Sequence, residues 1–594
     1  MIPRSPSAMH LGLAALVLGF SPITALHAQR TAVEAERGMV ASVHYLASEA
    51  GVEILKKGGN AVDAGVAVGL ALTVVHPFAG NLGGGGFMLI HLADGRDLAI
   101  DYRETAPAAA TREMFLGSDG NVLPAGPGSS TVGWSASGVP GSVAGFALAH
   151  RKYGSGKLSW AELCEPARRL AADGFTVSQA LAANLKVYAK HLGRFPESKR
   201  IFLADGAFHR AGDLWRQPEL AAVFARLQKE GPREFYEGET ARLIADAMAK
   251  NGGTITLADL KAYTPVERTP LRGSYRGHDI VTMPPPSSGG IALLQMLGML
   301  EPHDVARLGA NSAAKFHLFI EAMRRAFRDR AEFLGDPDFV GVPTAGLLDR
   351  AYIAGLMKNF DPAKATPSDG LAPGQPAGWK PVSVSRLSVR GARIASESTE
   401  TTHYSVVDAA GNAVANTTTL NGAFGSGVTI PGTGLLMNNE MDDFTSKVGV
   451  KNMFGLLQGP ANAIAPGKRP LSSMTPTFVF KNGALVLATG SPGGPTIINT
   501  VLQVVTNIID HGMPVAQAVE FPRFHHQWQP DTVSYDRFGM SPDTAALLTA
   551  MGHNLTERPN VIGGDAESIM IDPVTKLRLG ASDPRKPDAK AVGY

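Results

Sequence analysis

The chain has 594 residues, of which 44% are hydrophobic and 18% are charged, so it is long enough and apolar enough to bury a large core. Its 55 Lys and Arg against 53 Asp and Glu leave a net charge of +2, which argues against the basic surface that nucleic acid or an anionic membrane requires. A small-molecule partner is therefore favoured. The single cysteine, Cys164, excludes an intramolecular disulfide and a cysteine-based metal cluster.

Residues 1–28 predict a secretory signal peptide. Arg4 makes the start basic, an apolar stretch runs from Leu11 to Phe20, and small residues lead to Ala28, where cleavage is expected. An uncleaved membrane anchor is the alternative, but the apolar run is shorter than the roughly 20 residues that a span needs, and Pro22 interrupts it. No later stretch is long and apolar enough to span. We therefore expect a periplasmic or secreted protein.

The part of the chain after this leader predicts helices first and a strand pair next. From about Val33 to Val75 the pattern is helical, with two apolar-faced helices separated by Gly58 and Gly59. The stretch "NLGGGGFMLIHLADGRDLAIDYRE" then predicts a glycine turn and two short strands. A long middle section looks mostly helical, including "SAAKFHLFIEAMRRAFRDRAEF".

Between about Asp361 and Glu400 the composition changes to Pro, Gly, Ala and Ser without periodicity, which predicts a flexible segment. Two hairpins follow, one turning across Asp408 to Asn412 and one across Asn482 and Gly483. Helical patterns flank them at "TIINTVLQVVTNIIDHG" and "SPDTAALLTAMGH". The alternation of apolar residues in the hairpins, with helices beside them, predicts an α/β (α+β) fold in the form of a four-layer αββα sandwich.

Two adjacent threonines, Thr401 and Thr402, stand where the flexible segment meets the first hairpin. A threonine hydroxyl is a poor nucleophile without a base, and a threonine at an N-terminus has its own α-amine to serve as one. A tail that ends at Glu400 can be released while Thr401 stays fixed as the first residue of a core strand. We therefore predict cleavage between Glu400 and Thr401, which leaves a segment of residues 29–400 and one of residues 401–594.

Seven short motifs carry a resemblance to a known family. The motifs "TTHYSVVD", "NNEMDDF", "RPLSSMTPT" and "GSPGG", preceded by "NLGGGGFML", "DYRETAP" and "MPPPSSGG", resemble those of the γ-glutamyltranspeptidases in the same order. The match runs from about Arg37 to the C-terminus. The resemblance implies an N-terminal-nucleophile hydrolase that cleaves itself into a large and a small subunit, which form a heterodimer without a cofactor.

The implied activity is transfer of the γ-glutamyl group through an ester on Thr401. The donors would be glutathione and other γ-glutamyl compounds, and the acceptors would be water, amino acids or dipeptides. The nucleophile needs a hydrogen-bond partner, and alternation places Thr417 and Thr419 on one face of the hairpin, of which the resemblance selects Thr419. The glycines Gly493 and Gly494 can present two backbone N–H groups as an oxyanion hole.

A γ-glutamyl substrate carries a free α-carboxylate and a free α-ammonium, so its pocket needs one positive and one negative end. By resemblance, Arg103 clamps the carboxylate bidentately, helped by Ser472 and Ser473. The residues that the resemblance assigns to the ammonium are Asn421, Glu440 and Asp443.

Two positions depart from the family pattern. Many bacterial members have glutamine where this chain has Glu440, and a carboxylate there makes the ammonium end more negative, as in the mammalian form. In the segment that resembles a lid loop, Phe454 stands where a tyrosine usually closes over the pocket and hydrogen-bonds to the asparagine at Asn421. Phenylalanine keeps the cover and loses that bond, which bears on the balance between hydrolysis and transfer.

We expect no metal site, because His525 and His526 point to opposite faces of a strand and no third ligand is apparent. Two alternative functions remain. A cephalosporin-type acylase shares the fold and the self-cleavage but acts on glutaryl-like groups that lack an α-amine, so it has no use for Glu440 and Asp443. A secreted binding protein that has lost catalysis is the second, and the retained Thr401 and Thr419 argue against it.

Overall fold

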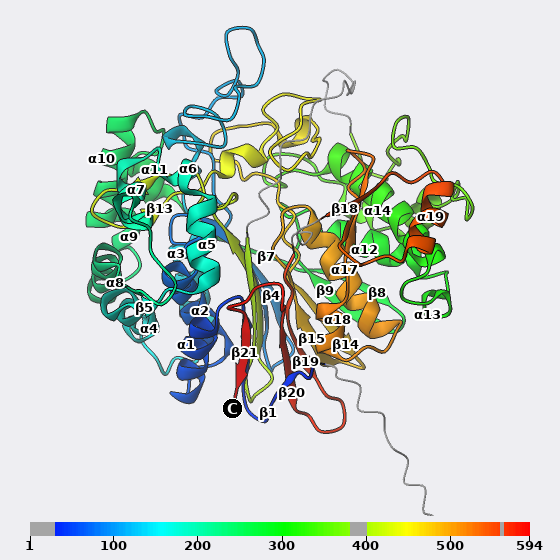
Figure 1. Cartoon of the computed structure of the whole chain (residues 1–594), viewed down its shortest axis with the longest axis horizontal. Helices are drawn as coiled ribbons and strands as arrows, with labels where there is room; N and C mark the ends of the chain where they lie inside the picture. Colours follow the sequence, from blue (N-terminus) through cyan, green and yellow to red (C-terminus); the bar gives the residue numbers. More distant parts are fainter. Residues whose placement is uncertain (1–29, 381–400, 559–563) are drawn as a thin grey trace, which may run out of the picture.

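The structure is a computed structural model that describes residues 30–380, 401–558 and 564–594. Within these ranges, two seven-stranded sheets are stacked face to face, and a layer of helices covers the outer face of each (Figure 1). The four-layer αββα sandwich expected from the hairpins and their flanking helices is therefore confirmed. The predicted signal peptide and the end of the predicted flexible segment, with Glu400, lie outside the described residues.

The strand that follows Thr401 lies in the middle of one sheet, which we call the nucleophile sheet. All of its neighbouring strands are antiparallel. In spatial order its strands are β21 (Lys590–Gly593), β2 (Met39–Ser42), β10 (Thr402–Val407), β11 (Ala413–Thr419), β3 (Gly85–His91), β4 (Asp97–Asp101) and β7 (Val266–Arg268).

The second large sheet is also antiparallel throughout. In spatial order its strands are β1 (Val33–Ala35), β20 (Arg578–Ser582), β19 (Glu567–Ile571), β15 (Ala484–Thr489), β14 (Thr477–Lys481), β9 (His278–Thr282) and β8 (Leu271–Tyr275). Smaller sheets lie at the periphery and comprise β5 (Phe175–Thr176), β6 (Leu214–Trp215), β12 (Thr429–Ile430), β13 (Leu435–Leu436), β16 (Phe524–His525), β17 (Val533–Asp536) and β18 (Leu555–Arg558).

The helices of the first layer, at the left of Figure 1, all come from the first half of the chain. They are α1 (Tyr45–Lys56), α2 (Ala61–Val75), α3 (Ser142–Tyr153), α4 (Trp160–Asp173), α5 (Gln179–Val187), α6 (Ala189–Leu192), α7 (Pro196–Phe202), α8 (Pro218–Glu230), α9 (Glu234–Glu237), α10 (Glu239–Asn251) and α11 (Leu257–Ala262). Helix α2 is buried over its whole length, because it lies between the nucleophile sheet and the outer helices.

The helices of the second layer, at the right of Figure 1, come from both parts of the chain. They are α12 (Gly289–Leu300), α13 (Val305–Leu308), α14 (Ala313–Phe333), α15 (Thr344–Leu347), α16 (Arg350–Leu356), α17 (Thr496–Ile509), α18 (Val515–Glu520) and α19 (Pro542–Ala550). Among the described residues, no helix has both the length and the apolar character needed to cross a bilayer.

Three apolar cores correspond to the three interfaces between the four layers. One lies between the first helices and the nucleophile sheet, and a second lies between the other sheet and α12, α14 and α17. The third fills the space between the sheets with side chains from both, including Phe87, Ala415 and Phe478. Because both faces of each sheet are covered, strands β10 and β11 are buried at every position.

The predicted elements around the site are confirmed, and one prediction is wrong. Both hairpins form, and Asn482 and Gly483 take positive φ angles of 52° and 78°, as an Asn-Gly turn requires. The helical pattern predicted from Val33 begins only at Tyr45, because residues before it form β1 and β2. Strand β2 pairs with β10 on one side and with β21 on the other. Periodicity alone cannot tell whether such a short apolar run forms a helix or a strand, and here the pairing with distant strands makes it a strand.

Residues 361–380 carry no helix or strand, in line with their composition, yet they are anchored to the fold by hydrogen bonds. The Ser368 carbonyl accepts from the Trp528 indole at 3.1 Å, and the Gly374 amide donates to Asp329 at 3.0 Å. This anchoring differs from the flexible segment that the composition predicts for residues 361–400. Polar partners on α14 and near β16 hold this stretch, and no local pattern reveals them.

Candidate active site

Thr401 stands immediately before β10, is buried, and lines a pocket together with Gly494. The hairpin register pairs Thr402 with Thr418, which places Thr401 opposite Thr419. The Thr401 hydroxyl donates to the Thr419 Oγ1 at 3.2 Å, and the Asn421 amide donates to the same oxygen at 2.8 Å. The structure therefore brings together the nucleophile and the partner that the sequence predicts, and Thr419 itself is held by the backbone that follows it.

Gly493 and Gly494 lie in the loop that connects β15 of the second sheet to α17. Their φ angles of 123° and 56° are in the region that favours glycine. Within the described part of the chain, neither amide N–H donates a hydrogen bond, and Gly494 lines the pocket with Thr401. Two such N–H groups can stabilise the oxyanion that forms when a hydroxyl attacks a carbonyl.

A buried cluster of charges forms the far end of the pocket. Arg103, just after β4, makes close ion pairs with Glu440 and with Asp443, the latter at 2.5 Å, and lies 3.9 Å from Glu104. Glu440 and Asp443 belong to the 3₁₀ helix η3 (Glu440–Asp443). Burial raises the pKa of the Asp443 carboxyl, while the Arg103 guanidinium opposes that rise.

Glu440 has the least favourable electrostatic environment in this charge cluster. Burial raises the pKa of its carboxyl well above the usual range, and Glu104 and Asp443 add to the effect against Arg103. Its two oxygens are buried and accept no hydrogen bond within the described residues, although one of them contacts Arg103 as an ion. One guanidinium thus faces three carboxylates, so a ligand ammonium placed here would gain hydrogen-bond acceptors and relieve repulsion.

The remaining predicted binding residues line the same pocket. Ser473 Oγ accepts from an arginine at 3.2 Å, and Ser472 Oγ accepts from the Met474 amide at 3.1 Å. Asn421 has a positive φ of 75°, and its side chain donates to the Asn439 carbonyl at 3.0 Å. The predicted residues that the structure places around this pocket are Arg103, Thr401, Thr419, Asn421, Glu440, Asp443, Phe454, Ser472, Ser473 and Gly494.

Phe454 covers the pocket from the segment that we call the lid loop, residues 446–458. Its ring lies against Gly494, so closely that a Cβ on this glycine would come within 2.9 Å of the ring. The Asn452 side-chain oxygen accepts from the amides of Phe454 and Leu456, each at 3.1 Å. The lid loop is therefore shaped by its own hydrogen bonds, and Phe454 contributes an apolar cover.

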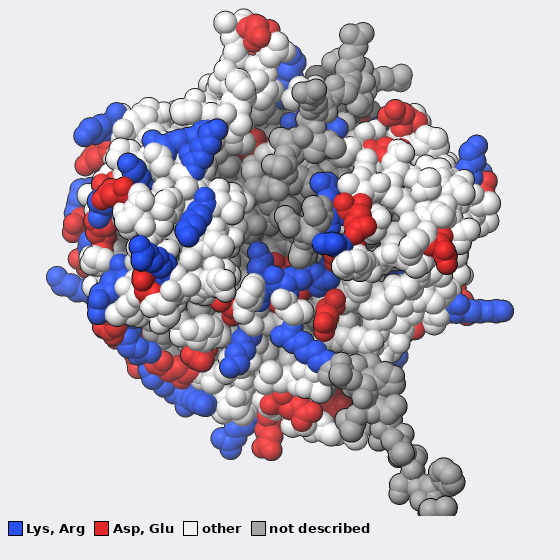
Figure 2. Space-filling model, in the orientation of Figure 1, with Lys and Arg blue, Asp and Glu red and all other residues white. Residues whose placement is uncertain are grey.

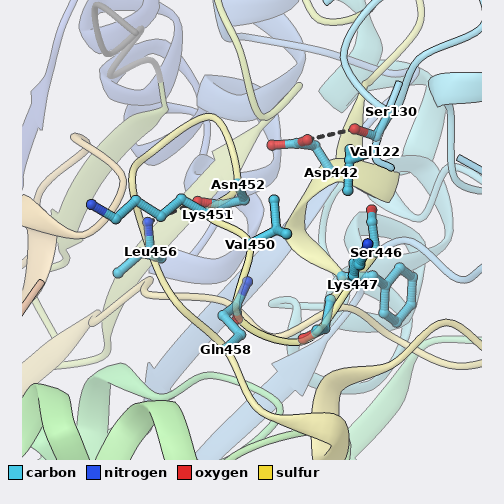
Figure 3. A pocket seen from close by; sticks show the side chains of 12 residues that line it. Val122, Ser130, Asp442, Ser446, Lys447, Val450, Lys451, Asn452, Leu456 and Gln458 are labelled. Carbon is cyan, nitrogen blue, oxygen red and sulfur yellow. Dashed lines mark hydrogen bonds between the residues drawn. The ribbon is translucent and has the colours of Figure 1, made fainter. Parts of the chain in front are cut away.

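A second pocket lies on the other side of the lid loop (Figure 3). Within it, Asp442 accepts from the Ser130 hydroxyl at 2.6 Å and from the Met453 amide at 2.9 Å. Burial raises the pKa of the Asp442 carboxyl to about 6. Asp442 therefore ties the lid loop to the segment around Ser130, which comes from the first part of the chain.

Arg330, on α14, is a pocket residue that sequence reasoning missed. Its side chain is buried between Ser288 and Ser473 and faces the same pocket as Thr401. Helix α14 carries several arginines within "RRAFRDRAEF", and nothing in the spacing distinguishes the one that reaches the pocket.

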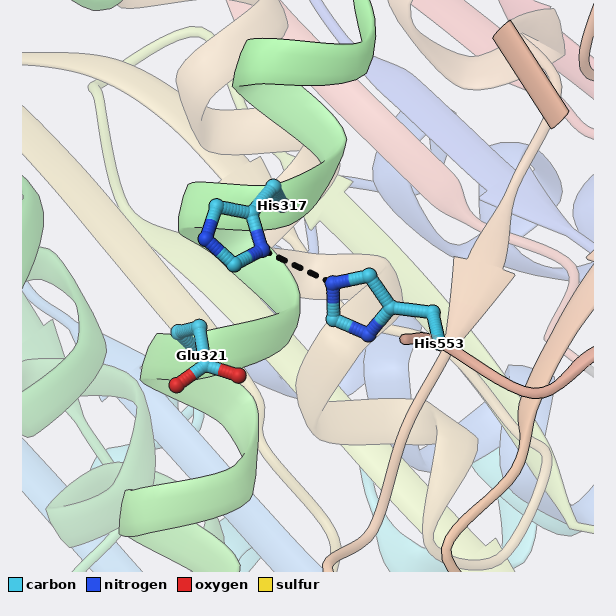
Figure 4. Close-up of side chains that lie close together, drawn as sticks. All are labelled: His317, Glu321 and His553. Atoms are coloured by element: carbon cyan, nitrogen blue, oxygen red, sulfur yellow. Dashed lines mark hydrogen bonds between the residues drawn. The ribbon is translucent and has the colours of Figure 1, made fainter. Parts of the chain in front are cut away.

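Three side chains of types that bind metals lie together away from the pocket, a group that the sequence did not reveal (Figure 4). His317 and His553 hydrogen-bond to each other at 2.8 Å, and His317 also bonds to the Asp361 carbonyl. The Glu321 carboxylate forms an ion pair with Arg325 at 2.6 Å and accepts a hydrogen bond from the Thr366 amide. The adjacent His525 and His526 likewise bond to Gln527 and Asp531. His553 Nδ1 is buried and makes no hydrogen bond within the described residues.

On the face shown in Figure 2, basic and acidic side chains are interspersed over both halves of the molecule, in keeping with the balanced charge of the sequence.

A four-layer αββα sandwich with a hydroxyl at the start of a central strand, beside backbone N–H donors, defines the class of N-terminal-nucleophile hydrolases. The chain belongs to the γ-glutamyltranspeptidase family, whose model matches residues 47–593.

Relatives and solved structures cover almost the whole chain. The chain is 50% identical to the glutathione hydrolase proenzyme of Escherichia coli (strain K12), across 95% of this chain and 93% of the relative. It is 40% identical to the acylase ACY 1 proenzyme of Pseudomonas sp. (strain V22), across 89% of each. The crystal structure of a cephalosporin acylase from Bacillus halodurans superposes with a TM-score of 0.82 at 26% identity, covering 97% of this chain and 99% of that one.

Proposed function

We propose that the chain is a self-cleaving γ-glutamyltransferase that hydrolyses glutathione and related γ-glutamyl compounds. The observation that carries this proposal is one pocket with two features. At one end the Thr401 hydroxyl bonds to Thr419, and at the other end Arg103 meets Glu440 and Asp443. A reactive hydroxyl and a pair of oppositely charged groups match a donor that carries an acyl group and an amino-acid end.

The first step of the mechanism makes the nucleophile. The Thr401 hydroxyl attacks the Glu400 carbonyl, the acyl group moves from nitrogen to oxygen, and water hydrolyses the resulting ester. The products are a large subunit of residues 29–400 and a small subunit of residues 401–594, with a free α-amine on Thr401. Because an α-amine has a pKa of about 7.7 to 8.0 in model peptides, it suits a general base near neutral pH.

The second step transfers the γ-glutamyl group. The Thr401 amine takes the hydroxyl proton as Oγ1 attacks the γ-carbonyl of the donor, and the N–H groups of Gly493 and Gly494 stabilise the oxyanion. The leaving amine departs with the proton, which leaves an ester on Thr401. Water then releases glutamate, or the amine of an amino acid or dipeptide takes the acyl group. No cofactor takes part in this scheme.

Donor recognition rests on the charged end of the pocket. Glu440 and Asp443, with Asn421, would bind the α-ammonium, and Arg103 with Ser472 and Ser473 would bind the α-carboxylate. The Glu440 Oε2 atom favours this assignment, because it is buried without a donor among the described residues and an ammonium would supply one. We also propose that residues 1–28 direct export, so that the enzyme works in the periplasm or outside the cell on extracellular γ-glutamyl compounds.

Two other functions are weaker. A glutaryl acylase, like the relative named acylase ACY 1, would bury three carboxylates around Arg103 without an ammonium to bind. A catalytically inactive binding protein would have no need of the Thr401 and Thr419 contact or of the glycine N–H groups beside it. Because the acylase alternative differs from the proposed function in its substrate, comparing turnover of two substrates tests it.

The test compares Asp443→Asn with the wild type on a γ-glutamyl anilide and on the glutaryl anilide that lacks the α-amine. We expect the wild type to prefer the γ-glutamyl compound. In Asp443→Asn its kcat/KM should fall on the order of 100-fold, because a buried ammonium loses a charged partner, while the glutaryl value changes little. Precursor cleavage should persist, because Thr401 and the glycine donors are untouched.

The matched control is Asp442→Asn, which removes the neighbouring carboxylate that faces the other pocket. Its effect should be the same on both substrates. A wild type that does not prefer the γ-glutamyl anilide, or an Asp443→Asn variant that weakens both anilides equally, would favour the acylase function.

A further inference from the structure

Gln527 is a buried side chain that reaches the lid loop from behind the pocket that Thr401 lines. It follows β16 and is only 4% exposed. Its side-chain Nε2 donates to the Phe454 carbonyl at 3.1 Å. Phe454 is the residue whose ring covers the pocket and lies against Gly494. The cover is therefore held both by its ring and by its backbone.

The direction of each hydrogen bond around Gln527 follows from its neighbours. The Asn499 side-chain amide donates to His525 Nδ1 at 2.7 Å, so this ring nitrogen is an acceptor. Burial lowers the pKa of His525 to about 4, and the ring is neutral at neutral pH. Its proton is therefore on Nε2, which donates to Gln527 Oε1 at 2.8 Å. With Oε1 used as an acceptor, the N–H donors of Gln527 are the ones that face Phe454.

This chain of hydrogen bonds joins the lid loop to the helix that follows the oxyanion glycines. Asn499 lies in the first turn of α17, which begins just after Gly494 and Pro495. Phe454 thus contacts this region through its ring, at Gly494, and through its carbonyl, by way of Gln527. A side chain without an N–H at position 527 would leave the buried Phe454 carbonyl without this donor.

We propose that Gln527 is a positioning residue that holds the Phe454 cover closed and thereby limits access of the acceptor to the acyl group. This inference rests on the proposed function, because the covered pocket is the one assigned to the γ-glutamyl donor. Gln527 acts through the backbone of Phe454 and does not itself line the pocket. A closed cover favours water over a larger amino-acid acceptor, so this bond sets part of the balance between hydrolysis and transfer.

The alternative role for Gln527 is to stabilise its own turn. Its Nε2 also donates to the Gln529 carbonyl at 3.3 Å, and its Oε1 accepts from His525. Loss of a purely local contact would lower the amount of folded enzyme, which slows hydrolysis and transfer alike. Loss of the lid contact would instead loosen residues 446–458 and change the ratio of the two reactions.

Limited digestion with trypsin measures the lid loop without reference to activity, because Lys447 and Lys451 lie within it. Gln527→Met keeps the length of the side chain and loses its N–H donors. We expect cutting after these two lysines, identified by mass spectrometry, to accelerate on the order of tenfold. Gln529→Met is the matched control, because the Gln529 side chain bonds to Asp369 at 2.8 Å, outside the lid loop. It should cut at the rate of the wild type.

The kinetic arm measures transfer and hydrolysis together, with a γ-glutamyl anilide as donor and glycylglycine as acceptor. In Gln527→Met the ratio of transfer product to glutamate should rise by about twofold or more, because the looser cover admits the dipeptide. The KM of the donor should rise by about threefold or more, while kcat for hydrolysis stays within about twofold of the wild type. Gln529→Met should change neither the ratio nor the KM.

Gln527→Asn is a second variant, whose amide is one methylene too short to reach Phe454, and it decides the matter should Gln527→Met fail to fold. It should show the same faster cutting and the same rise in the ratio. Unchanged cutting after Lys447 and Lys451, or faster cutting with an unchanged ratio, would overturn the role of Gln527 alone. A wild type without preference for the γ-glutamyl anilide over its glutaryl analogue would overturn the proposed function, whatever the result of the digestion.

Discussion

Single residues in this pocket take their places from the backbone around them. Thr401 meets Thr419 because the antiparallel register of one hairpin pairs Thr402 with Thr418, and the next residue on each strand forms the next pair. Alternation along the hairpin limits the predicted partner to Thr417 or Thr419, and the family resemblance selects Thr419. Arg330 could not be predicted, because its position depends on how α14 packs against the serine segments and no local pattern records that packing.

At the same scale, Asp442 gives the fold a pH dependence whose sign can be worked out. Burial raises the pKa of its carboxyl from 3.8 to about 6. The folded protein then binds this proton more tightly than the unfolded chain does. The stabilisation that the tighter proton binding of Asp442 gives the folded state is fully present below about pH 4 and is lost as the pH rises through about 6.

We expect Asp442→Asn to remove this dependence. From pH 4 to pH 7 the free energy of unfolding of the variant, relative to the wild type, should increase by up to about 3 kcal/mol. Urea denaturation at a series of pH values measures it. The exposed Asp246→Asn is the control and should show no such trend. A difference between Asp442→Asn and wild type that stays constant across this range would contradict the assignment.

At the scale of elements, the lid loop is the part whose behaviour the sequence leaves most open. Its residues have little periodicity, and its shape depends on side chains such as Asn452 and Asp442 that bond to the loop's own amides. The cover by Phe454 was predicted from the family motif, and the structure places that ring against Gly494. The ties of the loop to Asp442 and Ser130 could not be read from the sequence, because their partners are distant along the chain.

Phe454→Tyr tests how the lid loop affects the fate of the acyl group. A tyrosine hydroxyl at this position can hydrogen-bond to Asn421 and hold the lid loop closed. A closed lid loop admits a water molecule more readily than the larger amino-acid acceptor. We therefore expect the ratio of transfer to hydrolysis to fall by about twofold or more, with precursor cleavage unchanged. The ratio is obtained by following glutamate and transfer product together in the presence of an acceptor. Phe454→Leu, which lacks the hydroxyl, is the control; an unchanged ratio in Phe454→Tyr would contradict this role of the lid.

At the scale of the whole molecule, the two parts of the chain on either side of Thr401 are interleaved. In the nucleophile sheet, β10 and β11 lie between β2 and β3, and in the other sheet β9 from the first part pairs with β14 from the second. The sequence predicts the hairpins and therefore the layers, but not the order of strands, because the pairing of β2 with β10 joins residues far apart in the chain. Cleavage before Thr401 would leave two chains that share both sheets.

In the proposed mechanism, cleavage makes Thr401 an N-terminal nucleophile, and N-terminal sequencing of the purified protein is the direct test. The wild type should run as two bands on a denaturing gel and as one particle on gel filtration, and the smaller band should begin with "TTHYS". Thr401→Ala should remain a single chain and release no glutamate from glutathione. A smaller band that begins at another residue, or a Thr401→Ala variant that still cleaves and turns over glutathione, would contradict the claim.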